Sequence, residues 1–511
     1  MRRVACIALP EIRVEIAQED GSDLPLAVVI ARRGGSVKTE REVLGNTRLD
    51  VVSRAARAAG IRAGQTVAAA RAKHSELRVR VVAEDAVEGA LARVAEVAMA
   101  FGPAAAFDVT EDVVWVEIGG CAHLRGGEVA LARGLEARVR ALGHVCTVAV
   151  ADGPCIASAV ARYGGSPAGE PRIVPAGQGA EAMRALPIAA LALGDDVTRW
   201  LGDLGLRLCG DLQKLPRRSL GTRLGARAHD VMQRLDGEDR APLDAWRPPE
   251  VPEERVELEW GAESTEALAF VLKTLCDRLA ARLHGRAMAA ARLELVLTLD
   301  RALVDLRETV ARDSRALCHG AAHTSMLTVV LPAPLSRAAD LLAVLRVRLE
   351  QHTLAAPALA VTLRAPELAR APGRTLDMLE PEPRAALVLP RLVAELSAEL
   401  GPARVGVLAL TDTWSPDERT RLVPYGAPPP VTHHAMGTSV IEPSRLVEPS
   451  RTSFEELVSV HPLARYEATE WWRRGPRRRD LAAAWIGSAG EGALAWVELG
   501  EDDVLVRGWV D

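Results

Sequence analysis

Short apolar runs and helical patterns alternate along the first 165 residues. Residues 4–9 (VACIAL) and 26–31 (LAVVIA) are continuous apolar runs typical of buried strands, and residues 112–118 and 147–152 are further strand patterns. Helical spacing covers residues 48–61, where it stops at Gly60, and residues 86–102. We therefore expect an α+β domain in which antiparallel strand pairs are frequent.

The pattern changes after this region. Residues 166–240 show only short helical patterns, and a proline-rich boundary follows them. Residues 253–367 then combine two long helices (264–288 and 337–352) with three strands (291–300, 304–312 and 357–368), which predicts a compact sheet backed by two helices. Residues 425–437 and 441–451 have the composition of a linker. The last 41 residues hold five of the ten tryptophans, which predicts a small β-rich module.

Composition excludes several classes of protein. The 511 residues are 49% hydrophobic, so the chain can form several cores. A formal charge of −5 excludes a uniformly basic nucleic-acid coat but allows a local basic face, and the excess of arginine over lysine fits a general bias in base composition. Seven cysteines without a CxxC pair indicate neither a zinc site nor a disulfide framework. We expect a cytoplasmic protein without a signal peptide or a membrane span.

One stretch carries a family resemblance. Residues 116–128 (VEIGGCAHLRGGE), together with the order of the elements, resemble the Y-family DNA polymerases, and in particular a catalytically inactive branch in a bacterial mutagenesis system. The resemblance implies palm and fingers at 1–165, a helical thumb at 166–240 and a little finger at 253–367. It also implies a clamp-motif segment and linker at 368–455 and a C-terminal module at 456–511.

The resemblance also locates the metal-binding positions. Y-family members carry an aspartate nine residues before the glutamate of a Val-Glu pair and a second aspartate two residues later, which correspond here to Cys6 and Ala8. An Asp-Glu pair in a later strand corresponds to Asp112 and Val113. Two-metal phosphoryl transfer needs carboxylates, and a thiol is a poor ligand for Mg²⁺. The resemblance therefore implies an inactive polymerase homologue without a metal or other cofactor, in which Cys6 is a small buried hydrophobic residue.

A rearranged metal site is the alternative, and it would make the chain an active but divergent polymerase. Its ligands would be Asp108, Glu111, Asp112 and Glu117. Successive side chains of a strand point to opposite faces, so Asp112 and Glu117 do not converge easily. The nucleotide-binding positions are also altered. A Tyr-x-x-Arg motif of the family corresponds to Arg54 and Arg57, and two lysine positions correspond to Pro154 and Ser158.

Arginines in two regions are candidates for DNA contacts, because this family binds mainly the phosphate backbone. The thumb-like region has acidic residues at 195 and 196 and lacks a Gly-x-Gly hairpin turn, but several arginines follow it. Each arginine alone also fits a solvated surface residue. The candidates are Arg217, Arg218 and Arg223 in the thumb, and Arg292, Arg307 and Arg312 in the little finger.

Two further segments are candidates for protein contacts. Residues 375–379 match the family's sliding-clamp peptide in register, with threonine for glutamine and leucine for phenylalanine, and such an extended segment can insert apolar side chains into a groove. The clamp-binding candidates are Thr375, Leu376, Asp377, Met378 and Leu379. Residues 471–479 (WWRRGPRRR) suit DNA or an acidic protein surface, although a solvated basic loop is an equal alternative. The partner-binding candidates are Trp471, Trp472, Arg473, Arg474, Arg477, Arg478 and Arg479.

These features predict a non-catalytic adaptor in damage-induced translesion DNA synthesis. The resemblance implies four partners: primer–template DNA, the sliding clamp, a RecA-like accessory protein and an error-prone C-family polymerase. Two alternatives remain open, namely an active divergent polymerase and a protein-interaction hub that does not bind DNA.

Overall fold

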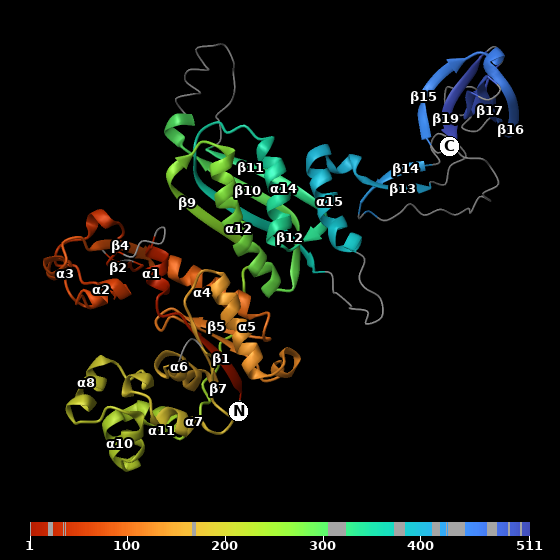
Figure 1. Ribbon diagram of the computed structural model, residues 1–511. Helices are drawn as coiled ribbons and strands as arrows, with labels where there is room; N and C mark the ends of the chain where they lie inside the picture. The colour runs from red at the N-terminus through yellow and green to blue at the C-terminus, as the bar shows by residue number, and fades with distance from the viewer. Residues whose placement is uncertain are drawn as a thin grey trace. The chain divides into compact units, whose positions relative to one another are not determined.

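The computed structural model divides the chain into two compact units, Met1–Glu399 and Leu400–Asp511, and each is described by itself (Figure 1). Its helices and strands confirm the expected α+β class. Short 3-10 turns connect several elements: Glu40–Glu42, Ala122–Arg125, Ile188–Leu191, Gly225–Arg227, Pro402–Arg404 and Phe454–Glu456. The structure describes residues 2–18, 24–33, 35, 37–165, 170–304, 323–371, 384–410, 420–425, 427, 445–467, 478–488, 491–500 and 503–510.

A five-stranded sheet, called here the N-terminal sheet, is the centre of the first unit. Its order is β5-β6-β1-β7-β8, with β1 (Arg3–Ala8) antiparallel to both β6 (Val113–Glu117) and β7 (Thr147–Asp152). The edge strands are β5 (Ala105–Asp108) and the short β8 (Arg172–Ile173), which pairs parallel to β7. The antiparallel pairing expected for the central strands is confirmed, whereas β8 is a strand within a region expected to be all helical.

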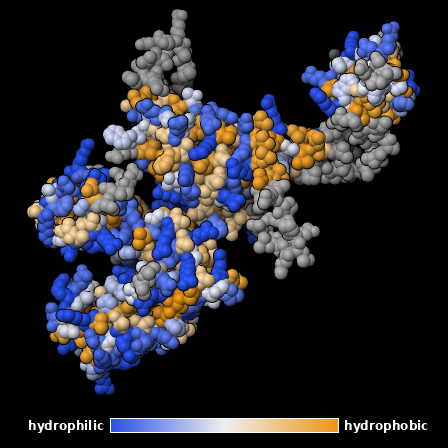
Figure 2. Space-filling view, in the orientation of Figure 1, coloured by the Kyte–Doolittle hydropathy of each residue, from blue (hydrophilic) through white to orange (hydrophobic). Residues whose placement is uncertain are grey.

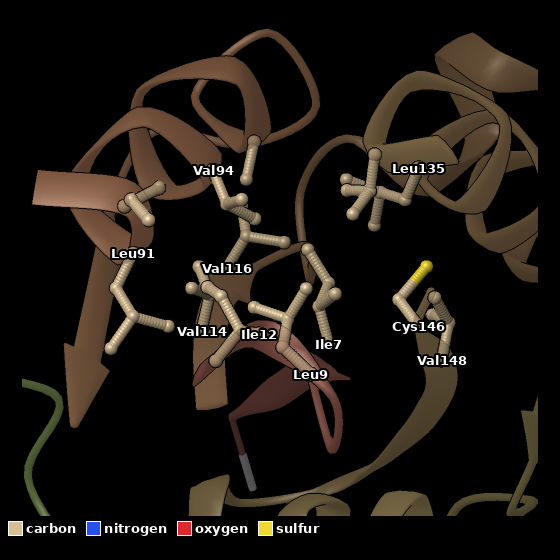
Figure 3. Packing of buried hydrophobic residues seen from close by; sticks show 14 of the residues in the cluster. Ile7, Leu9, Ile12, Leu91, Val94, Val114, Val116, Leu135, Cys146 and Val148 are labelled. Carbon is tan, nitrogen blue, oxygen red and sulfur yellow. The ribbon is translucent and has the colours of Figure 1, made fainter. Parts of the chain in front are cut away.

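Helices cover both faces of the N-terminal sheet. On one face, α1 (Ile12–Ala17), α4 (Glu84–Ala98) and α5 (Glu128–Ala141) contribute to a large apolar core with alternate residues of the strands. Figure 3 shows Ile7, Val114 and Val116 facing Leu91 and Val94 in this core. On the other face lies α6 (Pro154–Tyr163) with a second apolar cluster. The period of two along β1 thus sends its residues into two different cores.

A small three-stranded sheet follows α1. Its order is β3-β2-β4, with β2 (Leu26–Ala31), β3 (Val51–Val52), β4 (Arg78–Ala83) and the helices α2 (Arg54–Ala58) and α3 (Val67–Lys73). The helix predicted over residues 48–61 is wrong in its first part. Two β-branched valines pair with β2, and the Ser53 side chain caps α2 by accepting a hydrogen bond from the Ala56 amide.

Five short helices occupy residues 179–235. They are α7 (Gly179–Arg184), α8 (Asp195–Asp203), α9 (Cys209–Gln213), α10 (Arg217–Leu224) and α11 (Ala228–Leu235). Their buried residues, such as Met183, Leu201 and Leu212, belong to the same apolar cluster as α6. The helical prediction is confirmed for this stretch.

A four-stranded antiparallel sheet spans residues 253–370. Its order is β11-β10-β12-β9, formed by β9 (Glu253–Ala262), β10 (Met288–Leu299), β11 (Thr324–Leu335) and β12 (Ala358–Arg370). The helices α12 (Thr265–Gly285) and α14 (Ala338–Glu350) share one core with it, which confirms the expected sheet with two helices. The strand predicted over residues 304–312 lies outside the described residues except for Val304, which is helical, and β11, which was not predicted, pairs with β10.

Helix α15 (Arg384–Leu400) packs two alanines, Ala394 and Ala398, into the core of the 253–370 sheet. Its other side exposes Val388, Leu389 and Leu392, and Figure 2 shows hydrophobic residues gathered over this helix. No helix in the described part of the chain combines the length and apolarity needed to cross a membrane.

The second unit contains a two-stranded hairpin, β13 (Gly406–Leu410) with β14 (Thr420–Pro424), and a five-stranded antiparallel sheet. The predicted β-rich terminal module is confirmed, and Trp496 is buried in it. The first strand of this module, β15 (Arg445–Thr452), overlaps residues 441–451, which were expected to be linker. The sheet order is β15-β19-β18-β17-β16, with β15 (Arg445–Thr452), β16 (Leu457–Glu467), β17 (Arg478–Ser488), β18 (Glu491–Leu499) and β19 (Val504–Val510).

Candidate functional site

The three positions at which the resemblance places metal carboxylates lie together on one face of the N-terminal sheet. Ala8 of β1 is directly opposite Val113 of β6, and Cys6 lies two residues earlier on the same face. Cys6 and Val113 are 0% exposed and Ala8 is 3% exposed. All three join the apolar cluster that α6 covers with Ile156 and Val160. These residues do not fit Mg²⁺, which needs oxygen ligands.

The Cys6 thiol is held in its neutral form. Burial raises its pKa strongly, and the nearby Glu111 carboxylate raises it further. Only the thiolate is a good nucleophile or metal ligand, so this environment disfavours both roles. The complete burial of Cys6 is what a small buried hydrophobic residue would show.

Asp112, the remaining carboxylate of the expected set, is engaged by an arginine. It lies in the turn between β5 and β6 in a left-handed conformation, with φ of 54°. Helix α1 begins directly after β1 and brings Arg13 over this turn, where its Nε donates to the two carboxylate oxygens at 3.0 and 2.9 Å. Burial raises the pKa of Asp112, and Arg13 offsets part of that effect. A guanidinium therefore compensates the charge that a metal ion would otherwise compensate.

Glu111 faces a cavity of about 400 Å³ beside these residues. Its carboxylate accepts a hydrogen bond from the Ser158 hydroxyl at 2.9 Å and pairs with Arg162 at 3.2 Å. Sequence reasoning missed Arg162, although it lies four residues after Ser158 and thus on the same face of α6. The cavity lining includes Leu9, Pro10, Thr110, Glu111, Asp112, Arg162, Tyr163 and Arg172.

The carboxylates of the rearranged metal site are dispersed. Asp108 accepts hydrogen bonds from the amides of Thr110 and Glu111 at 2.6 and 3.0 Å, and Glu117 pairs with Arg2 at 3.3 Å. Within the described ranges, no three histidine, cysteine, aspartate or glutamate side chains form a group that could hold a metal ion.

The expected nucleotide-binding positions have local partners. The Arg57 guanidinium donates to the Glu11 carboxylate, which follows β1 in the chain, while the Arg54 side chain is exposed. Pro154 is the first residue of α6, where proline fits a helix start, and its carbonyl accepts from the Trp115 indole at 3.0 Å. These contacts give Arg57 and Pro154 a role in holding neighbouring elements together.

The arginines of the thumb-like region differ in how available their side chains are for contacts with DNA phosphates. Arg217 pairs with Asp236 at 2.6 Å, and the Arg223 guanidinium lies 5.4 Å from the centre of the Trp200 ring. Arg218 is exposed, and no side-chain partner is recorded for it within the described residues. The structure therefore leaves Arg218 as the candidate of this group that is most available to a phosphate.

The candidates in the 253–370 region are more restricted. Arg292 lies on β10 between two carboxylates, Glu294 at 3.0 Å and Glu367 at 3.2 Å. Arg364 of β12 also pairs with Glu294, at 2.7 Å. Arg307 and Arg312 lie outside the described residues. On this part of the sheet, arginines and carboxylates largely neutralise one another.

The two candidate protein-binding segments are mostly outside the described residues. This holds for the clamp-type segment 375–379 and for residues 471–477. Arg478 begins β17 and pairs with Asp480 at 2.9 Å, and Arg479 lies in the same strand opposite Tyr466 of β16. Both arginines thus belong to the edge pair of the terminal sheet.

Known proteins resemble parts of this chain. A model of the impB/mucB/samB family matches residues 23–162. Two proteins named Protein ImuB, from Caulobacter vibrioides strains NA1000 / CB15N and ATCC 19089 / CIP 103742 / CB 15, are each 33% identical over 216 residues. The match covers 42% of this chain and 46% of each relative, so the chain spans less than half the length of these relatives.

Solved structures include two similar chains, described as an insertion ternary complex of Dbh DNA polymerase and as DinB from Sulfolobus solfataricus. Each has a TM-score of 0.39 and 13% identity, and each comparison covers 71% of this chain and 98% of the other. Residues 23–162 are therefore similar to the impB/mucB/samB family, and the matched part of the chain is similar to Protein ImuB.

Proposed function

We propose that this chain is a non-catalytic, polymerase-like adaptor in SOS-type translesion DNA synthesis. In this proposal residues 1–165 are palm and fingers, residues 166–240 the thumb and residues 253–367 the little finger. They place the chain on primer–template DNA but add no nucleotides.

One observation carries the proposal. The positions that would hold two metal ions form a buried apolar patch of Cys6, Ala8 and Val113, and Asp112 is paired with Arg13. Two-metal catalysis needs several carboxylates that converge on the reacting phosphate, and a single one neutralised by arginine cannot supply them.

The partners in the proposal follow from the resemblance to ImuB. Residues 375–379 would bind the sliding clamp, with Leu376, Met378 and Leu379 inserted into an apolar groove. The C-terminal module and its segment 471–479 would contact the RecA-like accessory protein ImuA and an error-prone C-family polymerase, which performs the synthesis.

Primer extension tests the proposal. The purified chain should extend no primer with Mg²⁺ or Mn²⁺ and all four nucleotides, while it still retards primer–template DNA in a gel. An Asp112→Ala variant is the matched control. Extension by the natural chain that disappears in Asp112→Ala would show that the protein is an active polymerase and that the proposal is wrong.

A hub without DNA binding is the second candidate, because several expected phosphate contacts are paired with carboxylates. Arg217 and Arg292 both have acidic partners, whereas none is recorded for Arg218 among the described residues. For the adaptor, DNA affinity should fall steeply as salt rises, and Arg218→Ala should lower the slope of log K against log salt by about 1. Arg217→Ala should change this slope less. A hub would bind little DNA even at low salt, and neither Arg218→Ala nor Arg217→Ala would change that binding.

A further inference from the structure

A second cavity, separate from the one beside Asp112, lies between helices of the first unit. It has a volume of about 660 Å³ and is lined by the ends of α4 and α5, the middle of α12 and the start of α14. Its walls combine apolar residues, such as Val97 and Leu142, with charged residues. This size and mixed lining are typical of sites for small ligands.

The charged lining of this cavity is predominantly positive. Arg138 of α5, Arg278 of α12 and Arg337 at the start of α14 face it, against a single carboxylate, Asp277. Within the described part of the chain, no ion pair is recorded for any of these three arginines, whereas Arg282 on the same helix pairs with two glutamates. Three guanidinium groups therefore share one cavity with a single carboxylate.

His284, which also lines the cavity, lies close to these positive charges. The Arg138 Nη2 lies 3.0 Å from His284 Nε2, and a guanidinium has only donors, so Nε2 must accept the hydrogen bond. Burial lowers the pKa of His284, and the charges of Arg138 and Arg125 lower it further. The imidazole is thus neutral. It adds no charge of its own, so the net charge of the lining is set by the arginines and Asp277.

The start of α14 adds polar groups to the same cavity. Ser336, Arg337 and Ala338 line it, and no side chain caps the helix at Arg337. The carboxylate of Asp340, in the first turn of α14, lies 3.9 Å from Arg391 of α15 and therefore already has a cationic partner. The amides of a helix start and several arginines together suit a phosphate better than a carboxylate, because a phosphate offers more acceptor oxygens.

We propose that this cavity binds a small phosphate-class anion, either free pyrophosphate or the phosphates of a nucleotide. Arg138, Arg278 and Arg337 hold the phosphates, and the apolar wall leaves room for a nucleobase. Such a ligand connects α5 with α12 and α14, and its binding therefore favours the packing of these helices seen here. This proposal is independent of the adaptor role.

Calorimetric titration of the full chain with pyrophosphate, and separately with deoxyadenosine triphosphate, tests the proposal. We expect saturable binding that becomes at least tenfold weaker in the double variant Arg278→Ala/Arg337→Ala. The control variant Arg133→Ala/Arg348→Ala, with arginines on α5 and α14 that do not line the cavity, should bind within twofold of the natural chain. Binding of both ligands would indicate phosphate recognition alone, and binding of the nucleotide alone would indicate that the base contributes.

Three results would overturn the proposal: no saturable binding by the natural chain, equal weakening in both double variants, or equally tight binding of citrate at the same ionic strength. Thermal melting of each variant without ligand is recorded in parallel. A loss of affinity counts as support only if the double variant melts at the same temperature as the control variant.

Discussion

Replacing Glu96 by alanine is expected to lower the free energy of unfolding by about 3–5 kcal/mol, because it removes the carboxylate that pairs with Arg286 and one of the two that pair with the buried Arg282. Glu96 of α4 is 0% exposed and accepts a hydrogen bond from Arg282 Nε of α12 at 2.7 Å and another from Arg286. Arg282 also donates to the buried Glu254 of β9 at 3.0 Å. This cluster joins the N-terminal sheet's helix α4 to the 253–370 region.

The backbones of α4 and α12 also pack closely against each other beside this cluster. A Cβ atom on Gly285, the last residue of α12, would lie 2.0 Å from the Glu96 carbonyl oxygen. No side chain fits at that distance, so the helices touch through their main chains. The two helices therefore cannot shift easily to give Arg282 and Arg286 new partners when Glu96 is removed, and a large part of the cost of the lost pairs is expected.

Urea unfolding of the full chain, followed by circular dichroism, measures the effect. Glu88→Ala is the matched control, because Glu88 lies on the same helix and pairs with Arg33 at 3.1 Å in an exposed position. Such surface pairs contribute about 0–1 kcal/mol. If Glu96→Ala and Glu88→Ala destabilise the chain equally, the α4–α12 cluster does not contribute to folding as described.

Part of this contact had a signal in the sequence. Leu268, Leu272, Leu275 and Leu279 form the apolar stripe of α12, and Arg282 continues this stripe at the next buried position. An arginine on the buried side of an amphipathic helix indicates a buried acidic partner. Its identity as Glu96 could not be predicted, because the two residues are 186 positions apart.

The contacts at the expected metal positions could be predicted only in part. The family resemblance places metal positions at Cys6 and Ala8, by their spacing from Val14-Glu15, and at Val113, and the structure shows Ala8 opposite Val113. The pairing of Arg13 with Asp112 was not foreseen. It depends on how α1 packs over the turn before β6, and local patterns do not contain that information.

The missed strand β11 has a similar cause. Residues 324–335 place Leu327, Val329 and Leu331 at alternate positions, but a period of two alone does not select a partner strand. That partner is fixed by pairing, since Leu293 and Leu295 of β10 face Val329 and Leu327 across the ladder. Strand pairing is non-local, whereas the helices α12 and α14 follow from local periodicity.

Replacing Val113 by glutamate, which returns the family's residue to its position, is expected to destabilise the chain by about 3–4 kcal/mol at neutral pH. Val113 is 0% exposed, lies opposite Ala8 and belongs to the apolar cluster that contains Cys6 and Ile156. Such an environment disfavours the ionised form and raises the pKa of a carboxyl group. With a raised pKa in the folded state, the carboxyl group stays protonated at low pH, and the cost of burying it grows as pH rises above its unfolded-state pKa. The loss of stability relative to the natural chain should therefore be larger at pH 8 than at pH 5.

Val113→Gln is the matched control, since glutamine has the same size but cannot ionise. Thermal melting of both variants at pH 5 and pH 8, with and without Mg²⁺, separates the cost of charge from the cost of packing. We expect Val113→Glu to fall below Val113→Gln at pH 8 and Mg²⁺ to stabilise neither. Equal stability at pH 8 would mean that this face tolerates a charge, and stabilisation of Val113→Glu alone by Mg²⁺ would mean that it accepts a metal ion. In the second case the apolar patch would not exclude metal binding, and the adaptor proposal would lose its main argument.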